Sequence, residues 1–253
     1  MEKATVQSID RALSIIETLA GEKEGLGVTE ISTRVGLHKS TVHRLLSALG
    51  ERGYVEQRSG GAYRLGMKIV ELWSLYLNQV ELKTEAQPYL RRLLQLTKQP
   101  VHLAMLDGLE IIYIDKIETI HSIRMYSQIG RRSPALCTAT GKALLSGLPD
   151  AELCEKIRST KLPTYTSRSI TDPEALIKEI RLTRQRGWSR DDQEHEPGIR
   201  CIAAPIYDYR GNIIAAVSTS GLKQIITPAR DEEIAGFVMD AAHSISQRMG
   251  YRD

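Results

Sequence analysis

The sequence has few cysteines and few aromatic residues. Only three Cys and one Phe occur among 253 residues. The three thiols, Cys137, Cys154 and Cys201, are odd in number and match no paired zinc-ligand spacing, which argues against a disulfide framework and a structural zinc site. Because Phe is nearly absent, Leu, Ile and Val must fill the core. The hydrophobic content of 42% is ordinary for a folded protein.

A strong charge of one sign and long apolar runs are also lacking. The formal net charge is only +3, and residues 1–66 carry nine Lys and Arg against eight Asp and Glu. Any affinity for nucleic acid must therefore come from where the charges lie. No apolar stretch reaches the ~18 residues that span a bilayer, and no signal peptide is recognisable. We expect a cytoplasmic protein with no membrane partner.

Residues 28–66 have the order of elements of a winged helix-turn-helix. Apolar periodicity and turn residues predict, in order, helices over 8–20, 29–35 and 39–53 and strands over 54–58 and 62–65. Ser8 is expected to cap the first helix, and Gly36 supplies the permissive backbone of the turn before the third. This order predicts a DNA-binding domain over residues 1–66.

The third predicted helix has the composition of a helix that reads the major groove. Such a helix needs short polar and basic residues near its N-terminus. Together with one cation beside the turn of the wing, the candidate DNA-binding residues are Lys39, Ser40, Thr41, His43, Arg44 and Arg58. A solvated basic face, or a winged helix that binds protein, is the alternative. The N-terminal placement with a wing favours double-stranded DNA.

The rest of the chain predicts a linker helix over 67–81 and a second domain over 82–253. Helices are expected over 67–85, 87–97, 138–147, 150–158, 172–187 and 227–249, and strands over 101–106, 110–116, 122–128, 199–208 and 212–220. Strand pairs that alternate with helices predict an α+β domain with helices packed on a mainly antiparallel sheet.

Several blocks of the sequence resemble the IclR family of bacterial transcription regulators. They are Gly187–Asp208 with Asp191, Glu194 and Cys201 at the family's spacing, Gly130–Pro134 followed by Thr138–Leu145, and Ser8–Ile16 with Lys39–Leu46. The resemblance covers essentially the whole chain. It implies a winged helix-turn-helix joined to a GAF-like effector-binding domain, a homodimer or dimer of dimers, an operator of double-stranded DNA and a small organic acid as effector.

Matching positions carry the family's effector site onto this chain. They are Met125, Ala139, Thr140, Asp191, Cys201, Ser218 and Ser220. The residue chemistry agrees, because Asp191 can accept hydrogen bonds from ligand hydroxyls, and Ser218 and Ser220 lie two apart on a strand and face the same side. Ala139 and Gly141, small residues at a helix start, are expected to let a ligand approach the backbone amides.

Shorter blocks at 124–132, 198–203 and 249–251 look most like the repressors of the 2-keto-3-deoxygluconate regulon. The resemblance implies a repressor of sugar-acid catabolic genes that is released by a small keto acid, with 2-keto-3-deoxygluconate as the first candidate. A regulator that responds to glyoxylate, pyruvate or an aromatic acid is the alternative. A second domain that only oligomerises, and an enzyme acting on a keto acid, also remain open.

The same residues allow less specific interpretations. Cys201 could be a small core residue. Asp191, His195 and Cys201 could hold a metal, but their spacing matches no standard zinc pattern. Ser218 or Ser220 could act in a hydrolase, but no Gly-x-Ser-x-Gly elbow surrounds either. We therefore expect neither an enzyme nor a metal site, and no cofactor.

Overall fold

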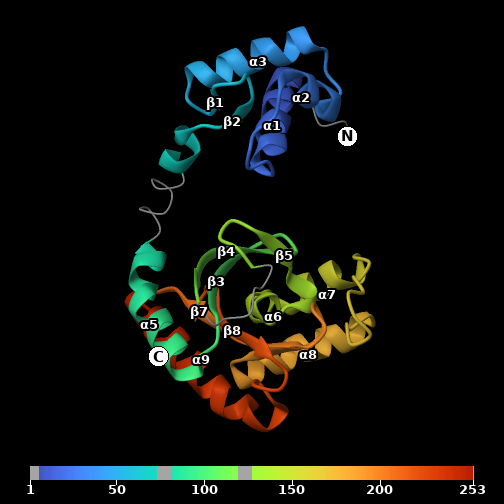
Figure 1. The fold of residues 1–253 in the computed structure, drawn as a ribbon. Helices are drawn as coiled ribbons and strands as arrows, with labels where there is room; N and C mark the ends of the chain where they lie inside the picture. The colour runs from blue at the N-terminus through green and yellow to red at the C-terminus, as the bar shows by residue number, and fades with distance from the viewer. Residues whose placement is uncertain (1–5, 73–80, 119–126, 253) are drawn as a thin grey trace. The chain divides into compact units, whose positions relative to one another are not determined.

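The computed structural model describes residues 6–72, 81–118 and 127–252 (Figure 1). The chain divides into two compact units, Met1–Val80 and Glu81–Asp253. Each unit has its own cluster of buried apolar side chains. Within the described ranges, no helix is long and apolar enough to cross a membrane.

The first unit is a winged helix-turn-helix, as the sequence predicts. Its elements are α1 (Gln7–Ala20), α2 (Val28–Val35), α3 (Lys39–Glu51), β1 (Val55–Gln57) and β2 (Tyr63–Leu65). The two strands pair antiparallel and form the wing. Apolar residues at helical spacing, among them Ile15, Ile31 and Val42, point inward and are fully buried. The core thus fixes which face of each helix remains outside.

The helix ends differ in detail from the expectation. Ser8 lies inside α1, which no side chain caps, so its predicted role as a cap is wrong. The helix α2 begins at Val28, because the Glu30 carboxylate accepts a hydrogen bond of 2.9 Å from the amide of Gly27. At its other end Gly36 has φ +64°, a left-handed conformation that glycine adopts without penalty and that turns the chain sharply into α3.

The predicted linker helix is described only at its two ends. Residues 67–72 are helical, and α5 (Glu81–Thr97) begins six residues before the predicted start at Gln87. Residues 73–80, between them, lie outside the described part of the chain.

The second unit contains a curled, six-stranded antiparallel sheet in the order β5-β4-β3-β8-β7-β6. Its strands are β3 (Val101–Asp107), β4 (Glu110–Ile117), β5 (Arg132–Pro134), β6 (Ser189–Asp192), β7 (Ile199–Tyr207) and β8 (Ile213–Leu222). The predicted α+β class is confirmed. The expected strand over 122–128 falls mostly outside the described residues, and Ser127 and Gln128 are not in a strand. The sequence did not predict the short strands β5 and β6.

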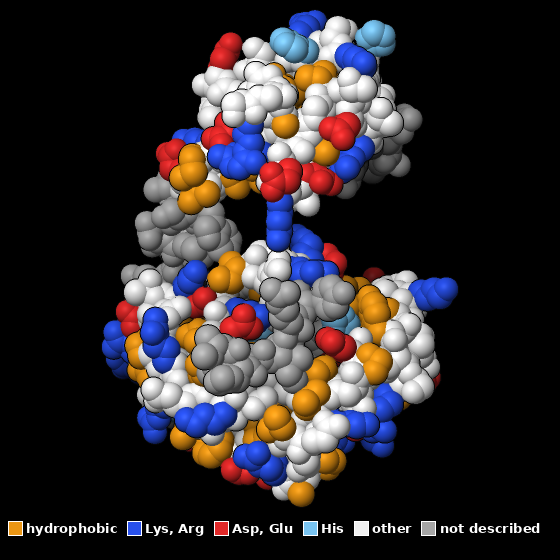
Figure 2. Space-filling model, in the orientation of Figure 1, with side chains coloured by type: hydrophobic (Ala, Val, Ile, Leu, Met, Phe, Trp, Pro, Cys, Tyr) orange, Lys and Arg blue, Asp and Glu red, His pale blue; other side chains and the backbone are white. Residues whose placement is uncertain are grey.

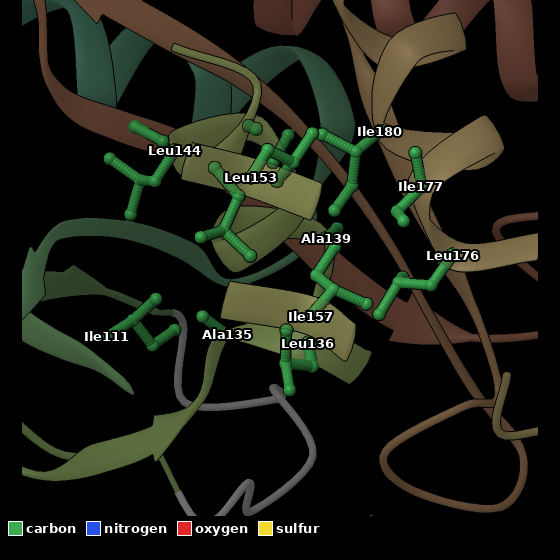
Figure 3. Packing of buried hydrophobic residues seen from close by; sticks show 14 of the residues in the cluster. Ile111, Ala135, Leu136, Ala139, Leu144, Leu153, Ile157, Leu176, Ile177 and Ile180 are labelled. Atoms are coloured by element: carbon green, nitrogen blue, oxygen red, sulfur yellow. The ribbon is translucent and has the colours of Figure 1, made fainter. Parts of the chain in front are cut away.

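Helices cover both faces of this sheet (Figure 1). The helices α5 and α9 (Asp231–Arg248) pack on one face. On the other, α6 (Ala139–Leu145) lies inside the curl of the sheet, and α7 (Asp150–Arg158) and α8 (Pro173–Arg186) pack outside α6. Side chains such as Leu153, Ile157 and Ile177 fill the space between these helices and the sheet (Figure 3).

Lys98, directly after α5, has a left-handed backbone. Its φ is +55°, and its amide donates a hydrogen bond of 2.8 Å to the carbonyl of Leu94. A side chain makes this conformation unfavourable, whereas glycine adopts it readily. We expect Lys98→Gly to raise the free energy of unfolding by about 0.5–1 kcal/mol, measured by urea denaturation. Lys98→Ala, which keeps a Cβ, should leave stability nearly unchanged, and an equal gain from alanine would contradict the backbone argument.

Candidate functional site

The helix α3 separates a buried face from an exposed one. Val42 and Leu46 are buried in the core, whereas Lys39, Ser40, His43 and Arg44 are exposed. Thr41 is half-buried. Figure 2 shows histidine and basic side chains on the outer surface of this unit, over α3. The structure therefore places the candidate DNA-binding residues of α3 on the outside of the unit, near the start of the helix.

Arg58 lies at the turn of the wing. It directly follows β1, and its amide donates a hydrogen bond of 2.8 Å to the carbonyl of Ala62 across the turn. Its guanidinium is 3.3 Å from the carboxylate of Glu24, which is almost fully exposed. An exposed ion pair of this kind contributes little to stability. Arg58 can therefore exchange this carboxylate for a phosphate at small cost.

Most residues of the expected effector site meet on the inner face of the sheet, against α6. Asp191 pairs with Cys201 across β6 and β7, and Cys201 pairs with Ser220 across β7 and β8, so the three lie in one row. Two residues along β8, the Ser218 hydroxyl accepts a hydrogen bond of 3.0 Å from the Thr140 hydroxyl of α6. We call this group the inner cup: Ala139, Thr140, Asp191, Cys201, Ser218 and Ser220. Met125 lies outside the described residues.

The start of α6 contributes backbone amides rather than open space. Thr138 caps the helix by accepting a hydrogen bond of 3.2 Å from the amide of Gly141. The amides of Ala139 and Thr140 lie in the first turn, where a helix has no acceptor of its own. A Cβ on Gly141 would lie 2.2 Å from backbone atoms of Ala135. The expectation that Gly141 makes room for a ligand is therefore wrong, because that space is filled by the protein itself.

Two charged residues beside the inner cup were not among the predicted site residues. Lys142 is fully buried, and its ammonium lies 2.5 Å from one carboxylate oxygen of Glu194. The amide of Glu194 in turn donates a hydrogen bond of 2.6 Å to the Asp191 carboxylate. A buried charge needs a partner, so the ion pair holds the turn after β6 against α6. Both residues lie within the sequence blocks that resemble the IclR family, and that position was the signal by which the sequence could have indicated them.

Burial changes the acidity of the inner cup. It raises the pKa of Asp191 to about 7; the nearby Lys142 ammonium opposes this rise, and the Glu194 carboxylate adds to it. Burial also raises the pKa of Glu194 and that of the Cys201 thiol. Burial therefore favours the neutral form of the Cys201 thiol, which is a weak nucleophile. Near neutral pH, Asp191 can donate a hydrogen bond as well as accept one.

The pKa of Asp191 makes stability depend on pH. Because it is raised from 3.8 to about 7 in the folded state, the contribution of this group is fully present below pH 3.8 and is lost as the pH rises through 7. Asparagine cannot ionise. We expect Asp191→Asn to be more stable than the parent by about 2 kcal/mol at pH 8, with a smaller difference at pH 4.5, in urea denaturation. A difference independent of pH would contradict a pKa of Asp191 that is raised by burial.

His195 does not join Asp191 and Cys201 in a metal site. Its ring packs edge-on against Tyr165, with ring centroids 5.1 Å apart. Among the residues that the structure describes, no group of three or more His, Cys, Asp or Glu side chains could hold a metal ion.

Comparison with known proteins identifies both units. The model of the IclR helix-turn-helix domain matches residues 8–59, and that of the bacterial transcriptional regulator IclR C-terminal domain matches residues 74–247. The HTH-type transcriptional regulators XynR and KdgR of Escherichia coli (strain K12) are 37% and 38% identical to this chain, each over 250 residues. The match covers 97% of this chain and 98% of XynR, and 98% of this chain and 95% of KdgR.

A solved structure agrees over nearly the full length. The crystal structure of an IclR homolog from Microbacterium hydrocarbonoxydans, complexed with 4-hydroxybenzoate, matches with a TM-score of 0.85 at 26% identity, over 96% of this chain and 98% of that chain. The matched families and relatives are transcription regulators and not enzymes. A helix-turn-helix domain is here joined to the C-terminal domain of the same family. The chain belongs to the IclR family of bacterial transcriptional regulators.

Proposed function

We propose that this regulator represses genes of sugar-acid catabolism and that a small keto acid releases it from its operator. The inner cup is the observation that supports a small organic acid as the effector. Thr140, Ser218 and Ser220 offer hydroxyls, α6 offers backbone amides, and Asp191 offers a carboxyl that can donate or accept. These groups match the carboxylate, keto and hydroxyl oxygens of 2-keto-3-deoxygluconate. The blocks that look like repressors of that regulon support this choice of acid.

The DNA part of the proposal places α3 in the major groove. Lys39, Ser40, Thr41, His43 and Arg44 would meet base edges and phosphates, and Arg58 would follow the backbone from the wing. Two copies of the chain in a dimer, or four in a dimer of dimers, would read the half-sites of a near-palindromic operator.

Release would follow from a shift between two conformations. A ligand moves such an equilibrium only if it binds one state more tightly than the other. A coupling free energy of about 1–3 kcal/mol between the two sites would be typical. An effector bound by Asp191 and the two serines would favour the state with the lower affinity for DNA.

An aromatic acid is the second candidate for the effector. The observation that favours it is the similar structure from Microbacterium hydrocarbonoxydans, which is complexed with 4-hydroxybenzoate. The two candidates differ in shape, because an aromatic ring is flat and apolar and a sugar acid carries several hydroxyls. Direct comparison of the two ligands decides between them.

Thermal unfolding with each acid tests the effector. A ligand that binds only the native state stabilises it by RT ln(1 + [L]/Kd), about 2.7 kcal/mol at a hundredfold excess over Kd. The panel is 2-keto-3-deoxygluconate, pyruvate, glyoxylate and 4-hydroxybenzoate. A rise of Tm with the first acid, together with release of a DNA duplex selected from a random library, is the expected result. A rise with 4-hydroxybenzoate alone would favour the aromatic acid, and no response to any of them would contradict the proposal.

Substitutions in the two units should have separate effects. We expect Arg44→Ala to weaken binding to the selected duplex at least tenfold, because a side chain that reaches a base edge or phosphate contributes about 1–3 kcal/mol. Its effector affinity should be unchanged. Arg52→Ala, at the opposite end of α3, is the matched control and should have little effect. Fluorescence anisotropy measures the first quantity and calorimetry the second. Equal losses for both arginines would contradict the proposed reading face.

A further inference from the structure

A buried histidine lies beside the inner cup. His102 on β3 is 1% exposed. It is the direct partner of Ser218 across β3 and β8, and direct partners on antiparallel strands place their Cβ atoms about 4.5–5.5 Å apart on the same face. The Ser218 hydroxyl meets Thr140 of α6, so this is the face of the inner cup. The imidazole of His102 therefore stands next to the hydroxyl of Ser218.

Among the described residues, one ring nitrogen of His102 has a hydrogen-bond partner and the other has none. Nε2 lies 2.8 Å from the hydroxyl of Ser127. Nδ1 is buried and has no hydrogen-bond partner among the residues that the structure describes. A buried polar atom without a partner is unfavourable, so this nitrogen is a position where a bound molecule would gain a hydrogen bond.

The ring is also neutral. Burial, with a smaller contribution from the nearby Lys116 ammonium, lowers the pKa of His102 to about 3. A neutral imidazole has one donor and one acceptor nitrogen. If Nε2 accepts from Ser127, Nδ1 donates, and if Nε2 donates, Nδ1 accepts. A hydroxyl group satisfies Nδ1 in both cases, because it can donate or accept a hydrogen bond.

We propose that His102 is a specificity-determining residue of the effector site, whose Nδ1 binds a hydroxyl of the effector beside Ser218. The inference rests on the proposed function, since it assumes that an organic acid enters the inner cup. It adds that the site selects an organic acid that carries a hydroxyl group over one that has none, such as pyruvate. An uncharged partner suits this environment, because the ring of Tyr113 packs against the imidazole of His102 with ring centroids 5.4 Å apart.

Two amide variants with different reach test the role of Nδ1. The side-chain amide of His102→Asn comes near the position of Nδ1, and that of His102→Gln comes near the position of Nε2. For 2-keto-3-deoxygluconate, measured by calorimetry on the full chain, we expect His102→Gln to bind about tenfold more weakly and His102→Asn to stay within about threefold of the parent. Pyruvate, which has no hydroxyl, should bind all three proteins with equal affinity.

Each other outcome is informative. If His102→Gln binds 2-keto-3-deoxygluconate as tightly as the parent, Nδ1 holds at most a water molecule and the inference is overturned. Equal weakening for both acids would indicate structural damage and would also overturn it. If the parent binds neither acid, the proposed function fails first, and this inference fails with it.

A measurement on the unaltered protein covers the case in which a variant does not fold. In the ¹⁵N spectrum of the imidazoles, 2-keto-3-deoxygluconate should shift the Nδ1 signal of the buried ring, and pyruvate should leave it in place. A spectrum in which both acids leave that signal unmoved would contradict the contact.

Discussion

Gly141→Ala is expected to prevent the second unit from folding stably. A Cβ at this position would lie 2.2 Å from both the Cα and the carbonyl oxygen of Ala135. These are backbone atoms, so no side-chain rotation relieves the overlap. Ala135 cannot easily retreat, because it is fully buried and its amide donates a hydrogen bond of 2.9 Å to the carbonyl of Leu109. We expect a loss of about 4 kcal/mol or more, or insoluble protein.

A second glycine of the same unit provides the matched control. Gly236 lies within α9, and a Cβ built there meets no atom within 4 Å. Alanine has the higher helix propensity, so Gly236→Ala should stabilise the protein by up to about 1 kcal/mol. Urea denaturation followed by circular dichroism compares the two variants. A Gly141→Ala protein with parental stability would show that α6 can move away from Ala135.

Gly141 also marks a limit of the sequence argument. The sequence shows that a small residue stands near a helix start, and this is compatible with either a ligand or a packing contact. Which of the two occupies the space depends on the path of residues 135–137, which turn back against α6. Local periodicity carries no information on that contact. The helices of the first unit were predictable because each is defined by its own apolar stripe.

The same distinction applies to the strands. The hairpins at Asp107-Gly108 and Arg210-Gly211 were predicted because turn residues separate two apolar runs. The strands β5 and β6 have three and four residues and a polar composition, and pairing with a neighbour is what makes them strands. No short-range signal could have found them.

Some residues of the candidate site could be found by their resemblance to the family, and others only from the structure. Apart from Met125, which lies outside the described part of the chain, the residues transferred by position come together in the inner cup, and their roles in binding remain a proposal. Lys142 would ordinarily be expected in solvent, because Lys is almost never fully buried without a partner. Its partner Glu194 is 52 positions away. His102 resembles any polar residue at the start of a strand until its pairing with Ser218 is known.

Lys142→Met is expected to destabilise the protein by about 3–5 kcal/mol at pH 8. The ammonium is 0% exposed and pairs at 2.5 Å with Glu194, which is 6% exposed. Removal of the cation would leave the Glu194 carboxylate buried without its counter-charge, close to Asp191. Both carboxyls already have raised pKa values through burial, and loss of Lys142, which lowers both, would raise them further. The folded variant should therefore take up protons.

This gives the cost of the substitution a definite dependence on pH. A carboxyl with a raised pKa in the folded state contributes stability that is lost as the pH rises through that pKa. The deficit of Lys142→Met should therefore be largest at pH 8 and should shrink toward pH 5, where Glu194 is more readily protonated. Urea denaturation at the two values measures it. A stability deficit that grows at low pH would contradict the explanation that the Glu194 carboxylate is left buried without its counter-charge.

Two further variants distinguish an unpaired buried charge from lost packing as the cause of the destabilisation. Lys142→Met with Glu194→Met replaces both charges by unbranched apolar side chains and should recover most of the lost stability, because a buried ion pair is often no better than an apolar pair of similar volume. Arg158→Met breaks an ion pair with Glu174 in which both partners are more than half exposed. It should change stability by less than about 1 kcal/mol. If the double variant were as unstable as Lys142→Met alone, the packing of the Lys142 stem, and not its charge, would hold α6 against the turn after β6.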